Sequence, residues 1–407
     1  MSDTEKKKIK YSTRIVGIIL SILVCVFNFT PYMVRIRQLP TAIFTDSEEI
    51  FEEYSEKAGI LLTAASDSET LGNRRISIKL FNLIELRSLC VYVGERGEVH
   101  PCGEAIGISI RTKGVLIVGN GSFINIDGKK CSPSAECGLH PGDVILSVNH
   151  IPVNTAEELQ GQINNSNSAL LSIERNGKSL SMEITPEFAP DGSKKIGAWV
   201  RDSTVGIGTL SFVDYSSGKL AALGHAIIDS DTGKMITVRT GKMVEAKILG
   251  IKKGRSGVPG ELQGTFASSS KLLGSIERNS EICIFGTVDE EFKNVCTDVL
   301  PVAFPDEVKK GTAFILSGVN EGKIEKYSCR IIKTVNQSEA NSKGMVIEIT
   351  DDRLLESTGG IVQGMSGSPI IQDGKVVGVV THVFINDPSK GYGVYAFWMY
   401  ELINNKK

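Results

Sequence analysis

The stretch Gly359-Gly-Ile-Val-Gln-Gly-Met-Ser-Gly-Ser-Pro-Ile370 joins a glycine-rich turn around Ser366 to a hydrophobic strand pattern. A serine in such a bend can project its hydroxyl, with neighbouring main-chain N–H groups aimed at a developing oxyanion. The stretch therefore fits acyl-transfer chemistry. Glycine and serine pairs also mark hairpin turns that carry no chemistry, and this alternative stays open on the motif alone.

Composition and charge narrow the class of protein. A chain of 407 residues suggests two or three domains, and its 42 glycines, few aromatic residues and frequent Val/Ile runs favour β-structure. Its 45 basic and 47 acidic side chains nearly cancel, so no broad positive field exists to attract nucleic acid. The eight cysteines lack Cys-x-x-Cys pairs and the cysteine–histidine spacing of zinc sites. We therefore expect no nucleic-acid partner, no metal and no cofactor.

The N-terminal region has the pattern of a membrane-directed segment. Basic residues from Lys6 to Arg14 precede the apolar run 15–29, as in a signal sequence or a signal anchor. No small-residue cleavage site follows, which favours an uncleaved single span over a cleaved signal sequence. The basic flank argues against the other alternative, a buried core helix. The rest of the chain, after Arg35, would then lie across the membrane. Residues 45–75 are acidic and polar, and indicate an exposed linker with at most a short helix.

The middle of the chain carries a specific motif, Gly138-Leu-His-Pro-Gly-Asp-Val-Ile145, followed by a capping box at Thr155–Glu158 and a hairpin signal at Asn176-Gly177. Residues 104–186 resemble a bacterial-type PDZ domain. The resemblance implies binding of extended peptides by addition of a strand to a sheet edge. It assigns that edge to Ile106, Gly107 and Ile108, although Gly107 could also be an ordinary strand glycine.

The C-terminal region, with short strands and turns, contains a candidate base for Ser366. His225 lies in an apolar, small-residue run, where it is either a satisfied core histidine or the group that activates the serine. His382 could line a specificity pocket or be buried for structural reasons. Several aspartates could support the imidazole, and the residues alone do not choose among them: Asp229, Asp298, Asp351 and Asp352.

Two levels of resemblance extend this interpretation. Gly364 to Pro369 matches the Gly-x-Ser-Gly-x-Pro pattern of chymotrypsin-like serine peptidases, and the whole layout resembles the stage IV sporulation protein B (SpoIVB) serine peptidase family. The most specific matching stretches are Ala222–His225, Thr358–Pro369, Thr381–Phe384 and Gly391–Tyr395.

The family resemblance implies a role for each site residue. Ser366, not Ser368, is the nucleophile, His225 the base and Asp351 the supporting carboxylate. The N–H groups of Gly364 and Ser366 form the oxyanion hole. Asp351 departs from the chymotrypsin-like pattern, in which the aspartate usually lies much farther before the serine.

We therefore expect a mainly β protein with four regions. These are a cytoplasmic tail and signal anchor (1–35), an exposed linker with a self-cleavage region (36–75), a PDZ domain with a preceding strand (76–188) and a chymotrypsin-like double β-barrel peptidase domain (189–407).

The resemblance also implies a function. Family members are exported across the forespore membrane into the intermembrane space, cleave themselves near the N-terminus, and cut a membrane-protein regulator of an intramembrane metalloprotease. That cut allows a late mother-cell sigma factor to mature. One alternative is a membrane-tethered PDZ scaffold with a non-catalytic C-terminal domain. Another is a quality-control peptidase of the HtrA type, although that class has the opposite domain order.

Overall fold

The computed structural model describes residues 42–45, 62–66, 73–80, 84–93, 96–267, 269–292, 296–320 and 323–404, with residues 17, 18, 21, 30 and 34. Most of the expected signal anchor and most of the expected linker lie outside this set. Within it, no helix is both long enough and apolar enough to cross a bilayer. The chain divides into two units, residues 1–95 with 336–338, and residues 96–335 with 339–407.

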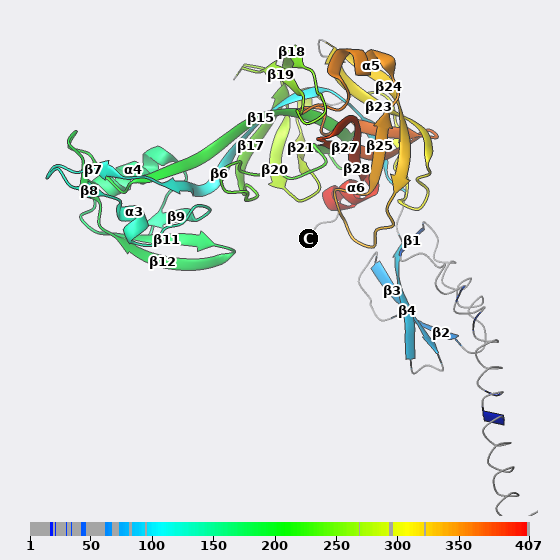
Figure 1. Cartoon of the computed structure of the whole chain (residues 1–407), viewed down its shortest axis with the longest axis horizontal. Coiled ribbons are helices and arrows are strands. Elements are labelled where there is room, and N and C mark those ends of the chain that lie inside the picture. Colours follow the sequence, from blue (N-terminus) through cyan, green and yellow to red (C-terminus); the bar gives the residue numbers. More distant parts are fainter. Residues whose placement is uncertain are drawn as a thin grey trace, which may run out of the picture. The chain divides into compact units, whose positions relative to one another are not determined.

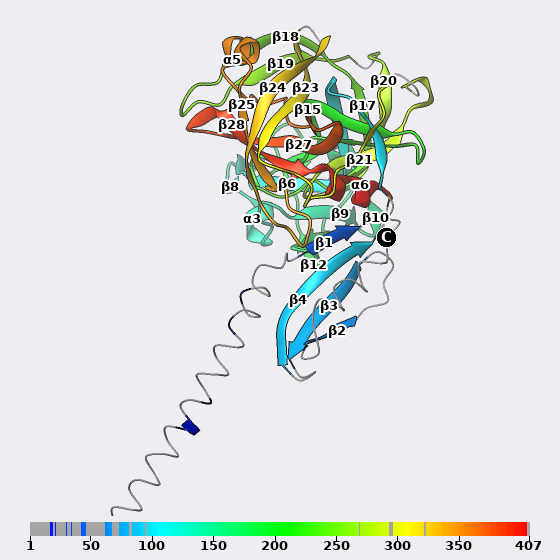
Figure 2. The same ribbon diagram turned by 90° about the vertical axis from the view of Figure 1, so that its right-hand side faces the viewer.

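The first unit contains a four-stranded sheet, which Figure 2 displays in blue. Its order is β1 (Ala42–Thr45), β4 (Ile84–Val93), β3 (Asn73–Leu80) and β2 (Leu62–Ser66). Two expectations are corrected here. Residues 62–66 and 73–75, expected in the linker, are strands. Residues 76–80 and 84–93, expected in the PDZ domain with its preceding strand, belong to this separate sheet.

The second unit begins with a six-stranded barrel, which the pairing of β6 with β15 closes. Around the ring its strands are β6 (Ala105–Asn120), β17 (Val238–Glu245), β20 (Leu272–Asn279), β21 (Ile284–Val288), β16 (Lys219–Ala222) and β15 (Ala198–Asp214). Alternate residues of a strand face the same side, so Ile106, Ile108 and Ile110 all enter the barrel core.

The PDZ module is inserted between the first two strands of this barrel. Its elements are α3 (Pro133–Glu136), β9 (Val144–Val148), β10 (Ile151–Pro152), α4 (Ala156–Asn164), β11 (Ala169–Arg175) and β12 (Lys178–Ile184), with the short hairpins β7 (Phe123–Ile124)–β8 (Lys130–Cys131) and β13 (Glu187–Phe188)–β14 (Lys194–Lys195). The predicted capping box is present at the start of α4, and Asn176-Gly177 forms the turn between β11 and β12 with positive φ at both residues.

Strands β6 and β15 belong to both the module and the barrel. The first half of β6 lies in the barrel core, whereas Val115 and Ile117 lie in the core of the module. Figure 1 shows β15 as one long green strand that runs from the module into the barrel. The expected boundary between residues 188 and 189 therefore differs from the structure, in which the barrel begins before the module.

The second barrel is closed and follows in sequence. Its strands, yellow to red in Figure 2, are β23 (Gly311–Asn320), β24 (Lys323–Thr334), β25 (Met345–Ile349), β28 (Asp387–Tyr395), β27 (Lys375–Phe384) and β26 (Pro369–Gln372). Helix α5 (Asp352–Thr358) precedes β26, and α6 (Ala396–Asn404) follows β28. Smaller elements are β5 (Glu98–Pro101), β18 (Lys247–Lys252), β19 (Glu261–Thr265), the 3-10 turn η1 (Glu290–Phe292) and β22 (Leu300–Pro301). The expected two-barrel architecture is thus present.

Candidate active site

The turn that carries Ser366 lies between α5 and β26 and depends on its glycines. Gly364 and Gly367 have φ values of +97° and +107°, a region that residues with a side chain rarely adopt. A Cβ on Gly367 would lie 2.0 Å from the carbonyl oxygen of Thr209. The glycine-rich sequence is therefore required by both backbone conformation and close approach.

Thr209 of β15 holds this turn from the other barrel. Its N–H donates to the carbonyl of Ser366 at 3.0 Å, and its hydroxyl donates to the carbonyl of Gly364 at 2.7 Å. The Thr209 residue is buried. Two hydrogen bonds thus fix the serine of the second barrel against the first barrel.

Ser366 and Ser368 differ in accessibility. Ser366 is half-buried and its hydroxyl donates to the carbonyl of Thr381 at 2.6 Å. Ser368 is fully buried, and its hydroxyl lies 3.2 Å from that of Ser317. Only Ser366 therefore faces the cavity, as the family resemblance implies for a nucleophile.

His225 follows β16 after two residues with left-handed backbone, Leu223 (φ +73°) and Gly224 (φ +71°). Its Nδ1 lies 2.8 Å from the carbonyl oxygen of Ala226. Because a carbonyl can only accept, Nδ1 carries the proton and the lone pair of the neutral ring is on Nε2. Burial lowers the pKa of His225 below its usual range, and the bond to Ala226 partly opposes that shift.

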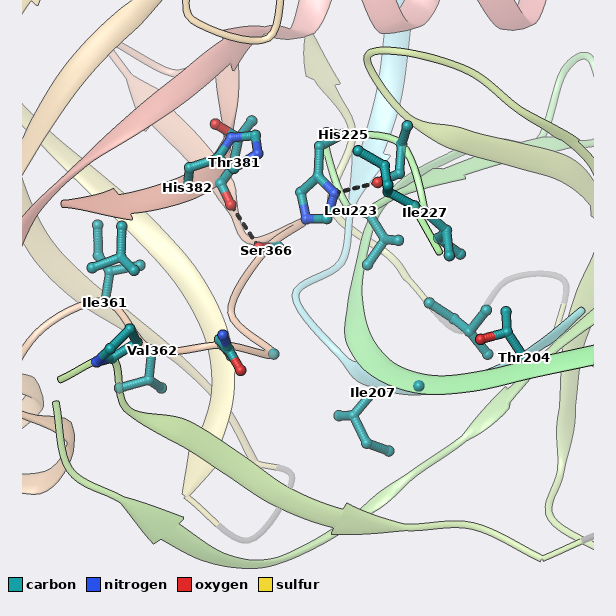
Figure 3. Close-up of a pocket in the computed structure, with 18 of the residues that line it drawn as sticks. Thr204, Ile207, Leu223, His225, Ile227, Ile361, Val362, Ser366, Thr381 and His382 are labelled. Atoms are coloured by element: carbon teal, nitrogen blue, oxygen red, sulfur yellow. Dashed lines mark hydrogen bonds between the residues drawn. The ribbon is translucent and has the colours of Figure 1, made fainter. Parts of the chain in front are cut away.

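Ser366 and His225 line the same cavity of about 550 Å³. Figure 3 shows Ser366 between the Thr381 strand and the His225 ring, with Ile361 and Val362 on one side and Leu223 and Ile227 on the other. Among the described residues the two side chains share no hydrogen bond, because the Ser366 hydroxyl donates to the carbonyl of Thr381. Rotation of the serine hydroxyl away from Thr381 would free it for Nε2, and such tightening on substrate binding is common.

The expected oxyanion donors are unengaged. In the described part of the chain, the N–H groups of Gly364 and Ser366 donate to no acceptor, whereas those of Met365, Gly367 and Ser368 all do. Two free main-chain donors beside a serine hydroxyl are what a tetrahedral oxyanion requires. The assignment of Gly364 and Ser366 is compatible with this geometry and stays a prediction.

Asp351 does not support His225 in the structure. Its carboxylate caps α5, accepts from the N–H groups of Ser328 and Arg353, and pairs with the Arg353 guanidinium at 3.0 Å. Nδ1 of His225 is bonded to a main-chain carbonyl instead. Asp229 is likewise engaged, with Arg201 and Thr232. Among the described residues that line the cavity, none is Asp or Glu.

The expected peptide-binding edge is also corrected. Ile106, Gly107 and Ile108 pair with β15 on one side and with β17 on the other. Ile106 and Ile108 are buried in the core of the first barrel. A strand with both neighbours in place has no free edge for a peptide. These residues are barrel residues, because the first half of the long β6 lies in the barrel and only its second half enters the PDZ module.

His382 lies on β27 at the same cavity, with its ring centroid 5.0 Å from that of His225. Burial, followed by the charges of His225 and Lys343, lowers the pKa of His382 to about 4. His382 is therefore neutral near pH 7 and does not oppose proton uptake by His225. The contacts of Thr209 and Thr381 with the Ser366 turn were not predicted from the sequence. Thr381 could have been suspected only because it begins the matching stretch Thr381–Phe384.

The acid limit of activity follows from these pKa shifts. His225 must be neutral to accept a proton, and its pKa lies below about 6.5. We expect the midpoint of the acid limb of kcat/KM to lie below the ordinary histidine value of about 6.5. A pH profile with a peptide substrate measures this, with His382→Asn as a control that should not raise the midpoint. A midpoint above 6.5 would contradict the burial argument.

Comparisons with known proteins agree with the two-part organisation. A model of the family "SpoIVB peptidase S55" matches residues 192–400, and a PDZ domain model matches residues 105–185. Proteins named as zinc metalloproteases from Brucella suis and Brucella melitensis are each 31% identical over 126 residues, 29% of this chain and 32% of theirs. A protein named as a probable DegP-like periplasmic serine endoprotease from Pseudomonas putida is 28% identical over 155 residues. These residues are 37% of this chain and 30% of that protein. The chain spans about a third of the length of these curated relatives.

Two solved structures show partial likeness. The PDZ domain of the SdrC-like protein from Listeria monocytogenes is 17% identical, with a TM-score of 0.17, and covers 22% of this chain and 87% of its own. The active form of a protease from M. tuberculosis is 16% identical, with a TM-score of 0.28. The match covers 50% of this chain and 76% of the protease.

Proposed function

Because this chain belongs to the SpoIVB peptidase S55 family, we propose that it is a membrane-associated, self-processing serine endopeptidase of sporulation signalling. The family and the PDZ match together make it a PDZ-containing serine peptidase. The roles of individual residues, the identity of the substrates and the sporulation pathway are what we propose beyond this.

In the proposed reaction, the Ser366 hydroxyl gives its proton to Nε2 of His225 and attacks the substrate carbonyl carbon. The N–H groups of Gly364 and Ser366 bind the resulting oxyanion. His225 then protonates the leaving amine, and a water activated by the same ring hydrolyses the acyl-enzyme. The observation that carries the proposal is one cavity lined by both Ser366 and His225, beside two unengaged N–H donors.

The wider function is inferred from the family. The protein would be anchored in, or secreted across, the forespore membrane and would act in the intermembrane space. It would cleave itself within residues 36–75, and then a membrane-protein regulator of an intramembrane metalloprotease, which activates a late mother-cell sigma factor. The PDZ module would hold the precursor or the target.

Two measurements test the proposal. A fluorophosphonate probe, which modifies activated serines, should label the purified full chain at Ser366 and not at Ser368, and His225→Ala should remove the labelling. The wild-type chain should also shorten with time, with a new N-terminus within residues 36–75. A tethered PDZ scaffold predicts the opposite: no labelled serine, no shortening, and full biological function in variants of Ser366 and His225.

The lining of the cavity predicts the substrate class. Ten of its described lining residues are Ile, Leu or Val: Ile108, Val205, Ile207, Leu223, Ile227, Ile228, Ile361, Val362, Val383 and Ile385. Among the described lining residues, His225 and His382 alone are histidine, acidic or basic. We expect cleavage beside uncharged apolar residues such as Leu or Met. Substituting Asp or Lys for that residue should lower kcat/KM by roughly 100-fold, because the charge would lose its hydration without a partner. A peptide series read by mass spectrometry measures this, and equal cleavage of the charged peptides would contradict it.

A further inference from the structure

Asn279, the last residue of β20, binds the loop that carries His225. Its Oδ1 accepts from the N–H of Ile227 at 2.9 Å, and its Nδ2 donates to the carbonyls of Ile227 and Ile236 at 2.8 and 2.9 Å. The residue is only 7% exposed. One buried side-chain amide therefore fixes both ends of the segment from Ile227 to Ile236.

The peptide group between Ala226 and Ile227 connects Asn279 to His225. Its carbonyl accepts the Nδ1–H of His225 at 2.8 Å, and its N–H donates to Asn279. Two hydrogen bonds at opposite ends of one amide strengthen each other, because each polarises the same conjugated group. His225, this peptide group and Asn279 thus form a continuous chain of hydrogen bonds.

We propose that Asn279 is a positioning residue of the catalytic centre, which acts on His225 through the Ala226–Ile227 peptide group. The Ala226 carbonyl takes the position beside Nδ1 that a carboxylate has in a Ser-His-Asp triad, and Asn279 supports the peptide group of that carbonyl. The inference rests on the proposed roles of Ser366 and His225. When His225 takes the serine proton, its Nδ1–H bond becomes charge-assisted, and a carbonyl polarised by Asn279 stabilises the positive ring. The same chain keeps the proton on Nδ1 and leaves Nε2 free for Ser366.

Two substitutions separate this role from simple packing. Asn279→Leu removes the polarising bond, so kcat should fall by roughly 10- to 100-fold with little change in KM, and the acid limb of the pH profile should move to lower pH. Asn279→Asp adds a negative charge near the ring, so the acid limb should move to higher pH. A purely structural residue would not produce shifts of opposite sign.

Asn125 offers a matched control within the PDZ module. It is also buried and holds a loop through hydrogen bonds from Asp127 and Lys129. Asn125→Leu in the full chain should leave the acid limb where it is in the wild-type protein. Unshifted or like-signed acid limbs in the two Asn279 variants would overturn the proposal.

If the Asn279 variants fail to fold, the tautomer of His225 in the wild-type chain still tests the proposal. With 15N-labelled histidine, the neutral ring of His225 should appear as the Nδ1–H tautomer, and an Nε2–H tautomer would overturn the proposal. Fluorophosphonate labelling distinguishes the two levels of failure. An unlabelled wild-type Ser366 would reject the proposed function, whereas a labelled Ser366 with unshifted acid limbs would reject only the role of Asn279.

A second, independent observation concerns two buried thiols in the core of the first barrel. The sulfur atoms of Cys102 and Cys296 lie 2.7 Å apart. Their backbones are held in place, because the N–H of Cys102 donates to the carbonyl of Ser211 and that of Cys296 to the hydroxyl of Tyr215. Thiols in ordinary van der Waals contact stay farther apart than this. The separation approaches the bond length of a covalent disulfide, about 2.05 Å.

We propose that Cys102 and Cys296 form a disulfide when the chain folds in the presence of a thiol–disulfide oxidant, such as glutathione disulfide. The thiolate of one cysteine attacks the oxidant and releases one reduced thiol. The second thiolate then displaces the other half from the mixed disulfide. Two cysteine protons are lost, and the oxidant takes up two electrons as two thiols. Burial raises the pKa of Cys102, so the bond should form before the core closes.

The full chain refolded in a glutathione redox buffer tests this. Alkylation in denaturant without reduction, followed by digestion and mass spectrometry, should give one peptide pair linked through Cys102 and Cys296, while Cys283 and Cys329, which are buried in the native fold, are alkylated. Reductant should lower Tm by about 5 °C or more in the wild-type chain and leave Cys102→Ser/Cys296→Ser unchanged. Alkylation of both cysteines, or equal Tm loss in the double variant, would overturn the proposal.

Discussion

Replacement of Ser366 by alanine should lower kcat for peptide cleavage by roughly 10⁴-fold or more and leave the fold intact. The hydroxyl makes one hydrogen bond, to the carbonyl of Thr381, and that carbonyl can bond to water in the accessible cavity. The two N–H donors of the turn remain in place, so substrate binding should change little. Steady-state assays with an apolar peptide, together with thermal unfolding, measure both parts.

Ser368→Ala is the matched control in the same turn. It removes a buried hydrogen bond to Ser317, which should cost about 1 kcal/mol of stability and leave most of the activity. If Ser368→Ala abolishes cleavage and Ser366→Ala retains it, the nucleophile is misassigned. If neither variant loses activity, the turn is not the catalytic element.

Gly367→Ala should have the second-largest effect, on both activity and stability. Its φ of +107° is strained for alanine, and the new Cβ would lie 2.0 Å from the backbone oxygen of Thr209. Backbone atoms on both sides leave no flexible group to move aside, so the turn must shift and the hydrogen bonds from Thr209 must break. We expect a loss of about 3 kcal/mol or more in the free energy of unfolding and at least roughly 100-fold in kcat.

Gly374→Ala separates the two causes of that loss. Gly374 also has a positive φ, +75°, but no other group lies within 4 Å of the place that an added Cβ would occupy. It should cost only about 1 kcal/mol and leave kcat unchanged. Denaturant unfolding and steady-state kinetics of both variants make the comparison, and equal losses would refute the close-approach argument.

The parts of the site that were predictable from sequence are those with a local signal. Ser366 lies in a Gly-x-Ser-Gly-x-Pro turn that matches a peptidase pattern, and His225 interrupts an apolar run. Asp351 was wrong as a partner of His225 because a third triad member is defined in space, and an aspartate at a strand end caps a helix equally well. Asn279 has no local signal, since it is a single asparagine at the end of a strand and its partners Ile227 and Ile236 lie far away in the sequence.

The fold was predictable where turn chemistry is strong. The module from Gly138 to Ile184 follows its motif, capping box and Asn-Gly turn. The edge assigned to Ile106–Ile108 was wrong because alternating apolar residues reveal that a strand exists and not which sheet it joins. The strands at 62–66 and 73–75 were missed because neither has the Val/Ile alternation that predicts a strand: their sequences are Leu-Thr-Ala-Ala-Ser and Asn-Arg-Arg.

The insertion of the PDZ module into the first barrel has a practical consequence for anyone who divides this protein into pieces. A recombinant fragment starting at residue 189 would lack the half of β6 that lies between β15 and β17. Both strands would then expose unpaired backbone N–H and C=O groups, which promote self-association. Excision is the better route. Arg111 of β6 and Ser203 of β15 are direct cross-strand partners. Replacing the residues between them with a two-residue Asn-Gly turn would remove the PDZ module and keep all six strands of the first barrel.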